Sequence, residues 1–382
     1  MSSINKIVIL GSGLMGHGIA QISAMAGYRV ALRDVEKSYL EKGMDRIKWS
    51  LDKLVEKQKL TQIDADRIYG RIDPVLDLRD ALFDADLLIE AVPEDMNLKR
   101  KVYEEVDKYA DSKTVYASNT STLPITEIGA LTSRPEHFVG LHFFNPPQLM
   151  QLVEVIPGHA TSQSTTDLAI NFIQKLGKQP ILCHKDVVGF IVNRIFIPLV
   201  HEAVYSQERN GISMTRIDSA VKFKLLFPMG IFELADYTGL DVVYKATVEM
   251  HSRDKTVINP HPMIKQLFDE GKLGQKSGRG FYDYRGENYE RIKLSPEEGD
   301  KYDPINLLSV AANNASWLIS NNVCDRVNLE RALKLGMGLK GDLFLTVEKV
   351  GINKVIQNLY QMADKFGPFY KPNEYLLNYA TK

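Results

Sequence analysis

The chain has few cysteines and little net charge, and both shortages exclude whole classes of protein. Cys183 and Cys324 are the only cysteines in its 382 residues, and they lack the spacing of a thiolate metal site. We expect each to be a buried structural thiol and predict no metal. The formal net charge is -1, so the chain lacks the basic field that usually accompanies binding to nucleic acid or to an anionic membrane.

Long hydrophobic runs are missing as well. The longest candidate, residues 189–200, is interrupted by Asn193 and Arg194, whereas a membrane span needs about 18 apolar residues. The first residues lead directly into an apolar segment at 6–10, which leaves no room for a signal peptide. We therefore expect a cytoplasmic protein without a membrane segment, of two or three domains at roughly 100–200 residues each.

A glycine-rich turn follows the apolar segment at 6–10 and precedes an amphipathic helical pattern. The turn reads Gly11-Ser12-Gly13-Leu14-Met15-Gly16. In a strand-turn-helix context, Gly11 permits the tight turn, Gly13 lets the backbone approach a pyrophosphate, and Gly16 lets helix and strand pack closely. We predict a dinucleotide site that includes Leu14 and Met15, with the helix N-terminus facing the phosphates.

An acidic residue decides which dinucleotide is expected. Asp34 follows a second apolar strand pattern at 28–32, where its carboxylate can accept hydrogen bonds from a ribose diol and would repel a 2′-phosphate. The sequence therefore favours NAD over NADP, although Arg33 beside the acid counts against this. Another strand pattern at 87–92 precedes Glu94 and Lys99, and a further one at 114–118 precedes Ser121. The carboxyl ends of such strands form the cofactor edge of a doubly wound sheet.

The segment between Asp34 and about residue 72 has strongly helical composition. Its polar residues at helical spacing are Arg46, Ser50, Lys53 and Lys57, and Ile47, Leu51 and Leu54 repeat with the same period on another face. This donor stripe could bind an anionic ligand or could simply be a solvated face.

Two further strand patterns lie close together, at 139–145 and 152–156. A short connection favours antiparallel pairing, which would place His142 opposite Glu154. A carboxylate bonded to one imidazole nitrogen fixes the tautomer and stabilises the imidazolium, so the other nitrogen can act as a general base. The pair is also compatible with a purely structural role.

Seven segments, in this order, resemble the L-3-hydroxyacyl-CoA dehydrogenase family: GSGLMGHGIA, ASNTSTL, GLHFFNPP, LVEVI, GFIVNR, PMGIFELADYTGLD and GQKSGRGFY. They span residues 4–285, about three-quarters of the chain. The resemblance implies an α/β Rossmann-type N-terminal domain followed by an all-α domain. It also implies NAD-dependent, reversible oxidation of a 3-hydroxyacyl-CoA to a 3-ketoacyl-CoA, a step of fatty acid β-oxidation.

The resemblance also assigns roles to residues of the matching motifs. It implies that His142 is the catalytic base, that Glu154 is its partner, and that Ser121, Asn145 and Asn193 hold the substrate or the nicotinamide. The implied cofactor contacts are Asp34, Glu94, Lys99 and Lys276, and the implied CoA contacts are Ser50 and Lys57. Two positions depart from the family pattern: Val188 replaces a proline at the domain hinge, and His17, which we interpret as a surface residue, replaces a small residue.

Helical periods replace strand patterns from Asp186 onward, and the helical stretch repeats itself. At an offset of 112 residues, Asp218 aligns with Glu330, Gly239 with Gly351 and Leu240 with Ile352, without a gap. We predict a Rossmann domain at 1–186, a first helical copy at 187–290 and a degenerate second copy at 291–382. Single-copy members of the family dimerise through this domain. We therefore expect the second copy to take the partner's place, and a monomer rather than a homodimer.

Two other functions remain open from the sequence. A relative with the same NAD site and His–Glu pair oxidises a CoA-free hydroxy acid such as L-gulonate, against which Ser50 and Lys57 favour CoA. A non-catalytic NAD-binding structural protein, of the lens type, is disfavoured by the intact His142, Glu154, Ser121 and Asn193.

Overall fold

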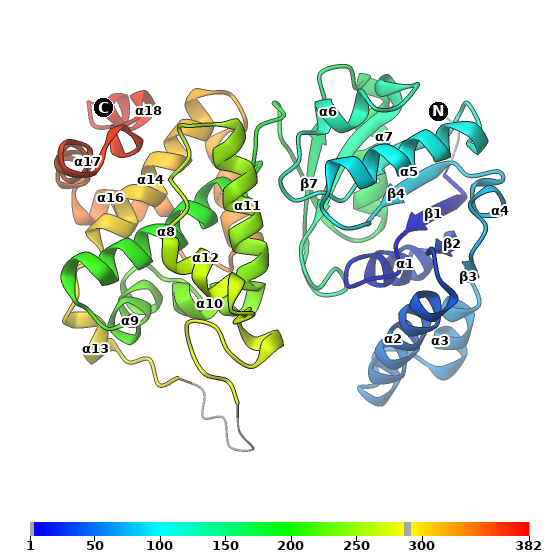
Figure 1. Cartoon of the computed structure of the whole chain (residues 1–382), viewed down its shortest axis with the longest axis horizontal. Helices are drawn as coiled ribbons and strands as arrows, with labels where there is room; N and C mark the ends of the chain where they lie inside the picture. The colour runs from blue at the N-terminus through cyan, green and yellow to red at the C-terminus, as the bar shows by residue number, and fades with distance from the viewer. Residues whose placement is uncertain (1–3, 286–291, 382) are drawn as a thin grey trace. The chain divides into compact units, whose positions relative to one another are not determined.

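A computed structural model describes residues 4–285 and 292–381. The chain divides into two compact units, Met1–Val187 and Val188–Lys382, which we call the α/β unit and the helical unit. The first is coloured blue to green in Figure 1 and the second green to red. The predicted boundaries at residues 186 and 290 stay predictions, and the second lies outside the described residues.

The α/β unit is built on one sheet. Its described strands are β1 (Lys6–Leu10), β2 (Arg29–Arg33), β3 (Ile72–Val75), β4 (Leu87–Glu90), β5 (Val115–Ser118), β6 (Phe138–Phe143), β7 (Leu152–Pro157) and β8 (Gln179–Leu182). They follow the order β3-β2-β1-β4-β5-β6-β7-β8. All neighbouring pairs are parallel except β6 and β7, which are antiparallel. This parallel-dominated sheet confirms the predicted Rossmann-type fold.

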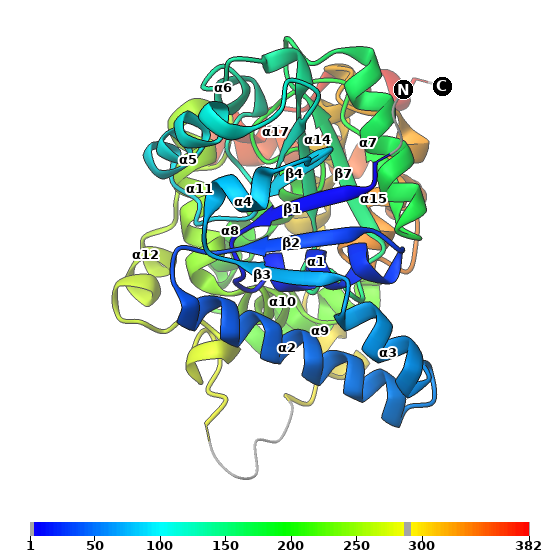
Figure 2. The same ribbon diagram turned by 90° about the vertical axis from the view of Figure 1, so that its right-hand side faces the viewer.

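Helices cover both faces of this sheet, which explains why its central strands are continuously apolar. They are α1 (Gly16–Met25), α2 (Lys37–Glu56), α3 (Gln62–Tyr69), α4 (Leu78–Leu82), α5 (Met96–Tyr109), α6 (Ile125–Gly129) and α7 (Gln163–Lys175), with a 3₁₀ turn η1 (Pro135–His137). Figure 2 shows α2 and α3 beside the β3 edge of the sheet. Ile47 and Leu51 of α2 are buried, as their helical spacing predicts.

The described residues of the helical unit fold into helices joined by loops. Those of its first part are α8 (Val192–Asn210), α9 (Met214–Lys224), α10 (Ile231–Thr238), α11 (Leu240–Arg253) and α12 (Pro262–Asp269), followed by η2 (Gln275–Ser277). Those of its second part are α13 (Pro296–Asp300), α14 (Ile305–Ser320), α15 (Arg326–Gly336), α16 (Leu343–Val350), α17 (Ile352–Phe366), η3 (Pro368–Tyr370) and α18 (Glu374–Tyr379). We call residues 188–285 the first helical region and residues 292–381 the second helical region.

The helices of the two regions recur with the spacing found in the sequence. The bounds of α15 and α16 are those of α9 and α10 moved by 112 residues, and α17 begins 112 residues after α11. Gly239 and Gly351 both have φ 103° at the junction of two helices, a backbone conformation that favours glycine. The regions pack directly on each other, with α8 against α14.

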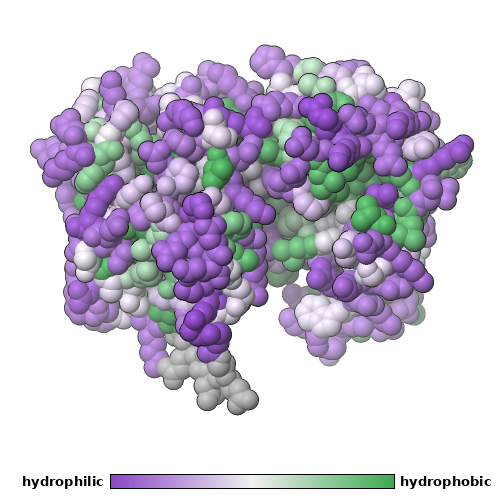
Figure 3. Space-filling view, viewed as in Figure 1, coloured by the Kyte–Doolittle hydropathy of each residue, from purple (hydrophilic) through white to green (hydrophobic). Residues whose placement is uncertain are grey.

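The described residues contain no helix long and apolar enough to cross a membrane. On the face drawn in Figure 3, hydrophilic residues predominate and apolar residues form small patches. Both cysteines are buried, which confirms the expected burial. The cytoplasmic location stays a prediction.

Candidate active site and cofactor site

The three glycines of the turn differ in what surrounds them. Gly11 has φ 95°, and a Cβ on it would lie 2.7 Å from the carbonyl oxygen of Ala91. A Cβ on Gly16 would lie 1.7 Å from the carbonyl oxygen of Gly11, whereas one on Gly13 would meet nothing within 4 Å. Gly11 and Gly16 are therefore required by the packing of the turn. Gly13 leaves open space where a pyrophosphate can approach the backbone at the start of α1.

Asp34 lies just beyond β2 and is held by the turn itself. Its Oδ2 accepts hydrogen bonds from the amide of Ser12 at 2.7 Å and from the Ser12 hydroxyl at 2.8 Å, and its Oδ1 accepts one from the amide of Val35. The carboxylate is thereby fixed beside the predicted phosphate site. The structure thus brings the glycine turn and Asp34 together, as predicted for one dinucleotide site. The contact is made by Ser12, to which the sequence assigned no role.

His17 is not the surface residue that we expected. It is buried, and its Nδ1 donates a hydrogen bond of 2.7 Å to the carbonyl oxygen of Gly13. Burial lowers the pKa of His17, the bond to Gly13 opposes this, and Arg46 lowers it further. The neutral imidazole therefore fastens the glycine turn to the first turn of α1, a local role that we did not predict.

A buried ion pair lies at the carboxyl end of β4. Nζ of Lys99 is 2.7 and 2.8 Å from the two carboxylate oxygens of Glu90, and both side chains are almost fully buried. Burial alone would lower the pKa of Lys99, but Glu90 and Glu94 outweigh it and raise that pKa. Lys99 is thus a structural cation beneath the site, 3.5 Å from Glu94. Glu90 was not among the predicted site residues, although a charge inside an apolar strand is the signal that could have found it.

Glu94 organises the loop that follows β5. Its Oε1 accepts hydrogen bonds from the hydroxyl of Thr120 at 2.6 Å, from the amide of Ser121 at 2.9 Å and from the amide of Thr122 at 3.1 Å. Burial would raise the pKa of Glu94, but Lys99 and these hydrogen bonds outweigh it and lower that pKa. Two residues predicted from separate motifs, Glu94 and Ser121, are therefore direct neighbours.

His142 and Glu154 face each other across the antiparallel pair of β6 and β7, as predicted. Nδ1 of His142 lies 2.6 Å from Oε2 of Glu154, and the carboxylate is fully buried. Contact with Glu154 assigns the Nδ1 proton, so that Nε2 carries the lone pair of the neutral ring. The ring of Phe144 packs against the imidazole, with ring centroids 4.5 Å apart.

The remaining predicted residues lie on other elements of the chain. Asn145, the second residue after β6, is exposed, and its peptide bond to Pro146 is cis. In the helical unit, Asn193 is the second residue of α8, and Lys276 in η2 forms an ion pair with Asp241. Ser50 lies on α2 and Lys57 at its C-terminal cap.

Two protein-family models match the chain. Residues 6–187 match the model of the 3-hydroxyacyl-CoA dehydrogenase NAD-binding domain, and residues 189–284 match that of the C-terminal domain of the same enzymes. The chain belongs to the 3-hydroxyacyl-CoA dehydrogenase family. This confirms the family, the predicted enzyme class, the NAD cofactor and the 3-hydroxyacyl-CoA substrate class.

Curated and structural relatives within this family cover the chain to different extents. The mitochondrial hydroxyacyl-coenzyme A dehydrogenase of Homo sapiens is 39% identical over 289 residues, which are 74% of this chain and 92% of that protein. The 3-hydroxybutyryl-CoA dehydrogenase of Bradyrhizobium diazoefficiens is 39% identical over 284 residues, 74% of this chain and 96% of that protein. The crystal structure of 3-hydroxybutyryl-CoA dehydrogenase from Escherichia coli K12 has 25% identity and a TM-score of 0.88, and it covers 100% of this chain and 99% of its own. The similarity to the last therefore includes the second helical region.

Proposed function

We propose that the chain catalyses the reversible oxidation of an L-3-hydroxyacyl-CoA to the 3-ketoacyl-CoA, with His142 as the general base and Glu154 as its orienting partner. The observation that carries the proposal is the 2.6 Å contact between Nδ1 of His142 and the fully buried Glu154. A base must be held in one tautomer and must have its positive charge stabilised once it takes a proton. The buried carboxylate meets both requirements.

In this mechanism Nε2 of His142 removes the proton of the 3-hydroxyl group, and Glu154 stabilises the imidazolium that forms. Bound NAD+ supplies the acceptor for the hydride that leaves C3. Ser121, Asn145 and Asn193 donate hydrogen bonds to substrate oxygens whose charge changes along the reaction. The contacts of Glu94 with the amides of Ser121 and Thr122 support such a role for Ser121, because they hold its backbone in one position.

We also propose the cofactor contacts, from the geometry of the glycine turn and the carboxylates near it. The open space at Gly13 and the carboxylate of Asp34 fit a pyrophosphate and an adenosine ribose, with Leu14 and Met15 beside them in the turn. Glu94 and Lys276 complete the set, and Lys99 acts through Glu94. We assign Ser50 and Lys57, on and next to α2, to the CoA moiety.

The test is the substitution Glu154→Gln, which preserves shape but removes the charge. We expect kcat to fall by about 100-fold or more, with KM for acetoacetyl-CoA nearly unchanged, because Glu154 acts on His142 and not on CoA. Glu105→Gln, on the exposed side of α5, is the matched control. A loss of less than about threefold in a steady-state assay would remove Glu154 from the mechanism. In the same assay, turnover of L-gulonate without turnover of acetoacetyl-CoA would contradict the CoA substrate.

We also propose that the second helical region is a copy of the first and takes the place of a partner subunit. The matched helix bounds support this, as does the packing of α8 on α14. The seam between them contains a buried polar contact, in which the hydroxyl of Tyr370 donates to Glu202 at 2.7 Å. We expect light scattering at micromolar concentration to give the mass of a monomer. A dimer whose interface contains the first helical region would contradict the proposal.

A further inference from the structure

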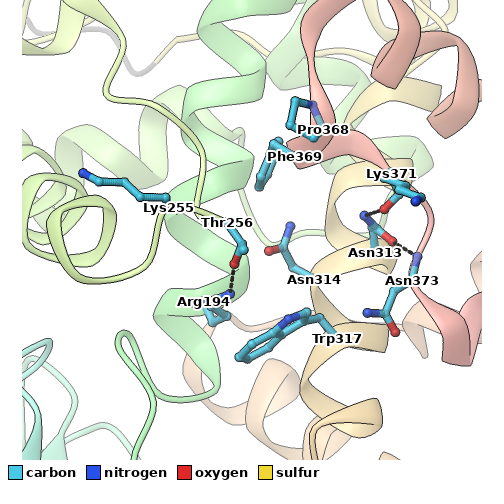
Figure 4. Close-up of a pocket in the computed structure, with 10 residues that line it drawn as sticks. All are labelled: Arg194, Lys255, Thr256, Asn313, Asn314, Trp317, Pro368, Phe369, Lys371 and Asn373. Atoms are coloured by element: carbon cyan, nitrogen blue, oxygen red, sulfur yellow. Dashed lines mark hydrogen bonds between the residues drawn. The ribbon is translucent and has the colours of Figure 1, made fainter.

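The two tryptophans of the chain have opposite surroundings. Trp317 lies against Arg194, whose guanidinium is 3.8 Å from the centre of the indole ring, and Figure 4 shows both residues at a cavity of the helical unit. Trp49, on α2 of the α/β unit, is 65% exposed and makes no ring stacking or cation contact with a described residue. Tryptophan is highly buried on average, so this indole offers an unusual flat apolar surface to a ligand.

Trp49 lies beside a row of cations on the same helix. Residues three or four positions apart are neighbours on a helix surface, so Arg46 and Lys53 flank the indole, and Lys57 follows four residues after Lys53. Lys53 pairs with Glu56 at 2.6 Å, whereas Arg46 and Lys57 are exposed and form no ion pair with a described residue. Two cations near the indole therefore remain available for a ligand phosphate.

This row of cations begins close to the glycine turn. A Cβ on Gly43 of α2 would lie 2.8 Å from Cβ of Ser12, so the helix packs against the turn at that point. Burial and, less strongly, the charge of Arg46 lower the pKa of His17, which is bonded to Gly13 of the turn. The cations of α2 therefore continue outward from the expected pyrophosphate site.

Acidic residues lie on the other side of the indole. Asp45 is four residues before Trp49 and Asp52 three residues after it, so at 3.6 residues per turn Trp49 separates an acidic edge of α2 from its basic edge. Carboxylates repel a phosphate and accept hydrogen bonds from an amino group. The charge pattern therefore suits a ligand with phosphates at one end and an amino-bearing aromatic base at the other, which is the chemistry of an adenine nucleotide.

We infer that Trp49 stacks on the adenine of coenzyme A and that Arg46, together with Lys57, binds phosphate groups of the same nucleotide. The inference rests on the proposed function, which supplies coenzyme A as the ligand and assigns Ser50 and Lys57 to it. Stacking of a base on an aromatic side chain contributes to binding, and the adenosine end of coenzyme A takes no part in hydride transfer. Trp49 and Arg46 therefore lower KM and leave kcat unchanged.

Kinetics with two thioesters test the role of Trp49. Trp49→Ala should raise KM for acetoacetyl-CoA about tenfold at unchanged kcat, and Trp49→Phe, which keeps an aromatic face, should recover most of that loss. Acetoacetyl-pantetheine has the same reacting group and no nucleotide, so its kcat/KM should stay within twofold in Trp49→Ala. Phe83→Ala, which removes another exposed aromatic ring of the same unit, is the matched control and should change neither substrate.

Fluorescence measures binding at Trp49 without turnover. Trp317→Phe leaves Trp49 as the single tryptophan, and saturating NAD+ fills the dinucleotide site. Under these conditions coenzyme A and adenosine 3′,5′-bisphosphate should quench the signal saturably, whereas pantetheine should not. Arg46→Gln should raise the Kd of the bisphosphate about fivefold, and Arg79→Gln, at an exposed arginine of α4, should leave it unchanged.

The two measurements distinguish failure of the nucleotide site from failure of the proposed reaction. Quenching by coenzyme A in a chain that does not turn over acetoacetyl-CoA would contradict the proposed function and support the nucleotide site. Turnover of acetoacetyl-CoA with an unchanged KM in Trp49→Ala, an equal rise of KM for both thioesters, or equal quenching by pantetheine and coenzyme A would each overturn the stacking role of Trp49.

Discussion

The first and second helical regions share a pattern of helices and differ at residues of the family motifs. Both place a carboxylate of one helix on the N-terminus of another: Asp218 accepts the amides of Phe232 and Glu233 at 2.8 and 3.2 Å, and Glu330 accepts those of Leu343 and Phe344 at 3.0 and 3.4 Å. The longer glutamate reaches the helix one residue earlier. A helix N-terminus needs a partner for its amides wherever it is buried, so this device persists in both regions.

The features that differ are the ones tied to the family motifs. Asn193 corresponds to Ile305, and the loop residue Gly230 corresponds to Asp342. A Cβ on Gly230 would lie 2.0 Å from Cγ of Asp218, so its glycine is enforced by close packing, whereas Asp342 caps α16 with its own side chain. The comparison teaches that the two regions keep the same helix cap and build the loop before the capped helix in different ways.

The largest expected effect is on catalysis. Asn193→Ala should lower kcat/KM for acetoacetyl-CoA by about 100-fold, the size of effect that removal of one hydrogen-bond donor to a developing charge produces. Ile305→Ala, at the corresponding place in the second region, should leave it within twofold. Steady-state kinetics on the two variants measure kcat/KM for each. Equal losses would mean that both regions serve the reaction, and the comparison would fail.

A smaller difference is expected between the two helix caps, in the stability that Asp218 and Glu330 each contribute. Asp218→Ala removes two backbone bonds and the bond from the hydroxyl of Tyr282, which we expect to cost about 3 kcal/mol of local stability. Glu330→Ala, with two longer bonds and a partly exposed side chain, should cost about 1 kcal/mol. Hydrogen exchange of peptides covering α10 and α16 measures each loss locally. A greater loss at α16 would reverse the ranking.

Near neutral pH the smallest expected effect is that of His201, whose contribution to stability changes only as the pH falls. Burial, assisted by His261, lowers the pKa of His201 to about 3, and its Nδ1 accepts the amide of His261, so protonation would break that bond. The unfolded state therefore binds the proton first, and stability is lost as the pH falls from about 6.5 towards 3, by roughly 1.4 kcal/mol per pH unit at most.

Replacing His201 by the corresponding residue of the second region tests whether His201 causes this pH dependence of stability. Asn313 corresponds to His201, so His201→Asn should flatten the dependence of the urea midpoint on pH between 6.5 and 4, as followed by Trp317 fluorescence in a Trp49→Phe background. His159→Asn, an exposed histidine of the α/β unit, is the control. A slope that survives His201→Asn would assign the acid sensitivity to another group.

The sequence predicted those parts of the fold and the site that depend on short-range pattern. The glycine turn between its strand and helix and the facing of His142 and Glu154 follow from local spacing, because two strands joined by a short turn have few ways to pair. The bonds of Ser12 and Glu90 could not be predicted in this way, because their partners lie on other elements, 22 residues away for Ser12 and Asp34 and 9 for Glu90 and Lys99. The partner of His17, Gly13, is only four residues away, but the local pattern did not indicate that His17 is buried.

The three glycines of the turn serve two different requirements, the folding of the chain and the binding of a dinucleotide. Gly11 and Gly16 are held by contacts with the protein's own backbone, and Gly13 borders empty space. A descendant that no longer bound a dinucleotide would still be selected to keep the outer two glycines for folding, while the middle one could drift to alanine or serine. In this fold the middle glycine is therefore the position that reports on dinucleotide binding. Its replacement by another residue would indicate a protein that keeps the fold and no longer binds the cofactor.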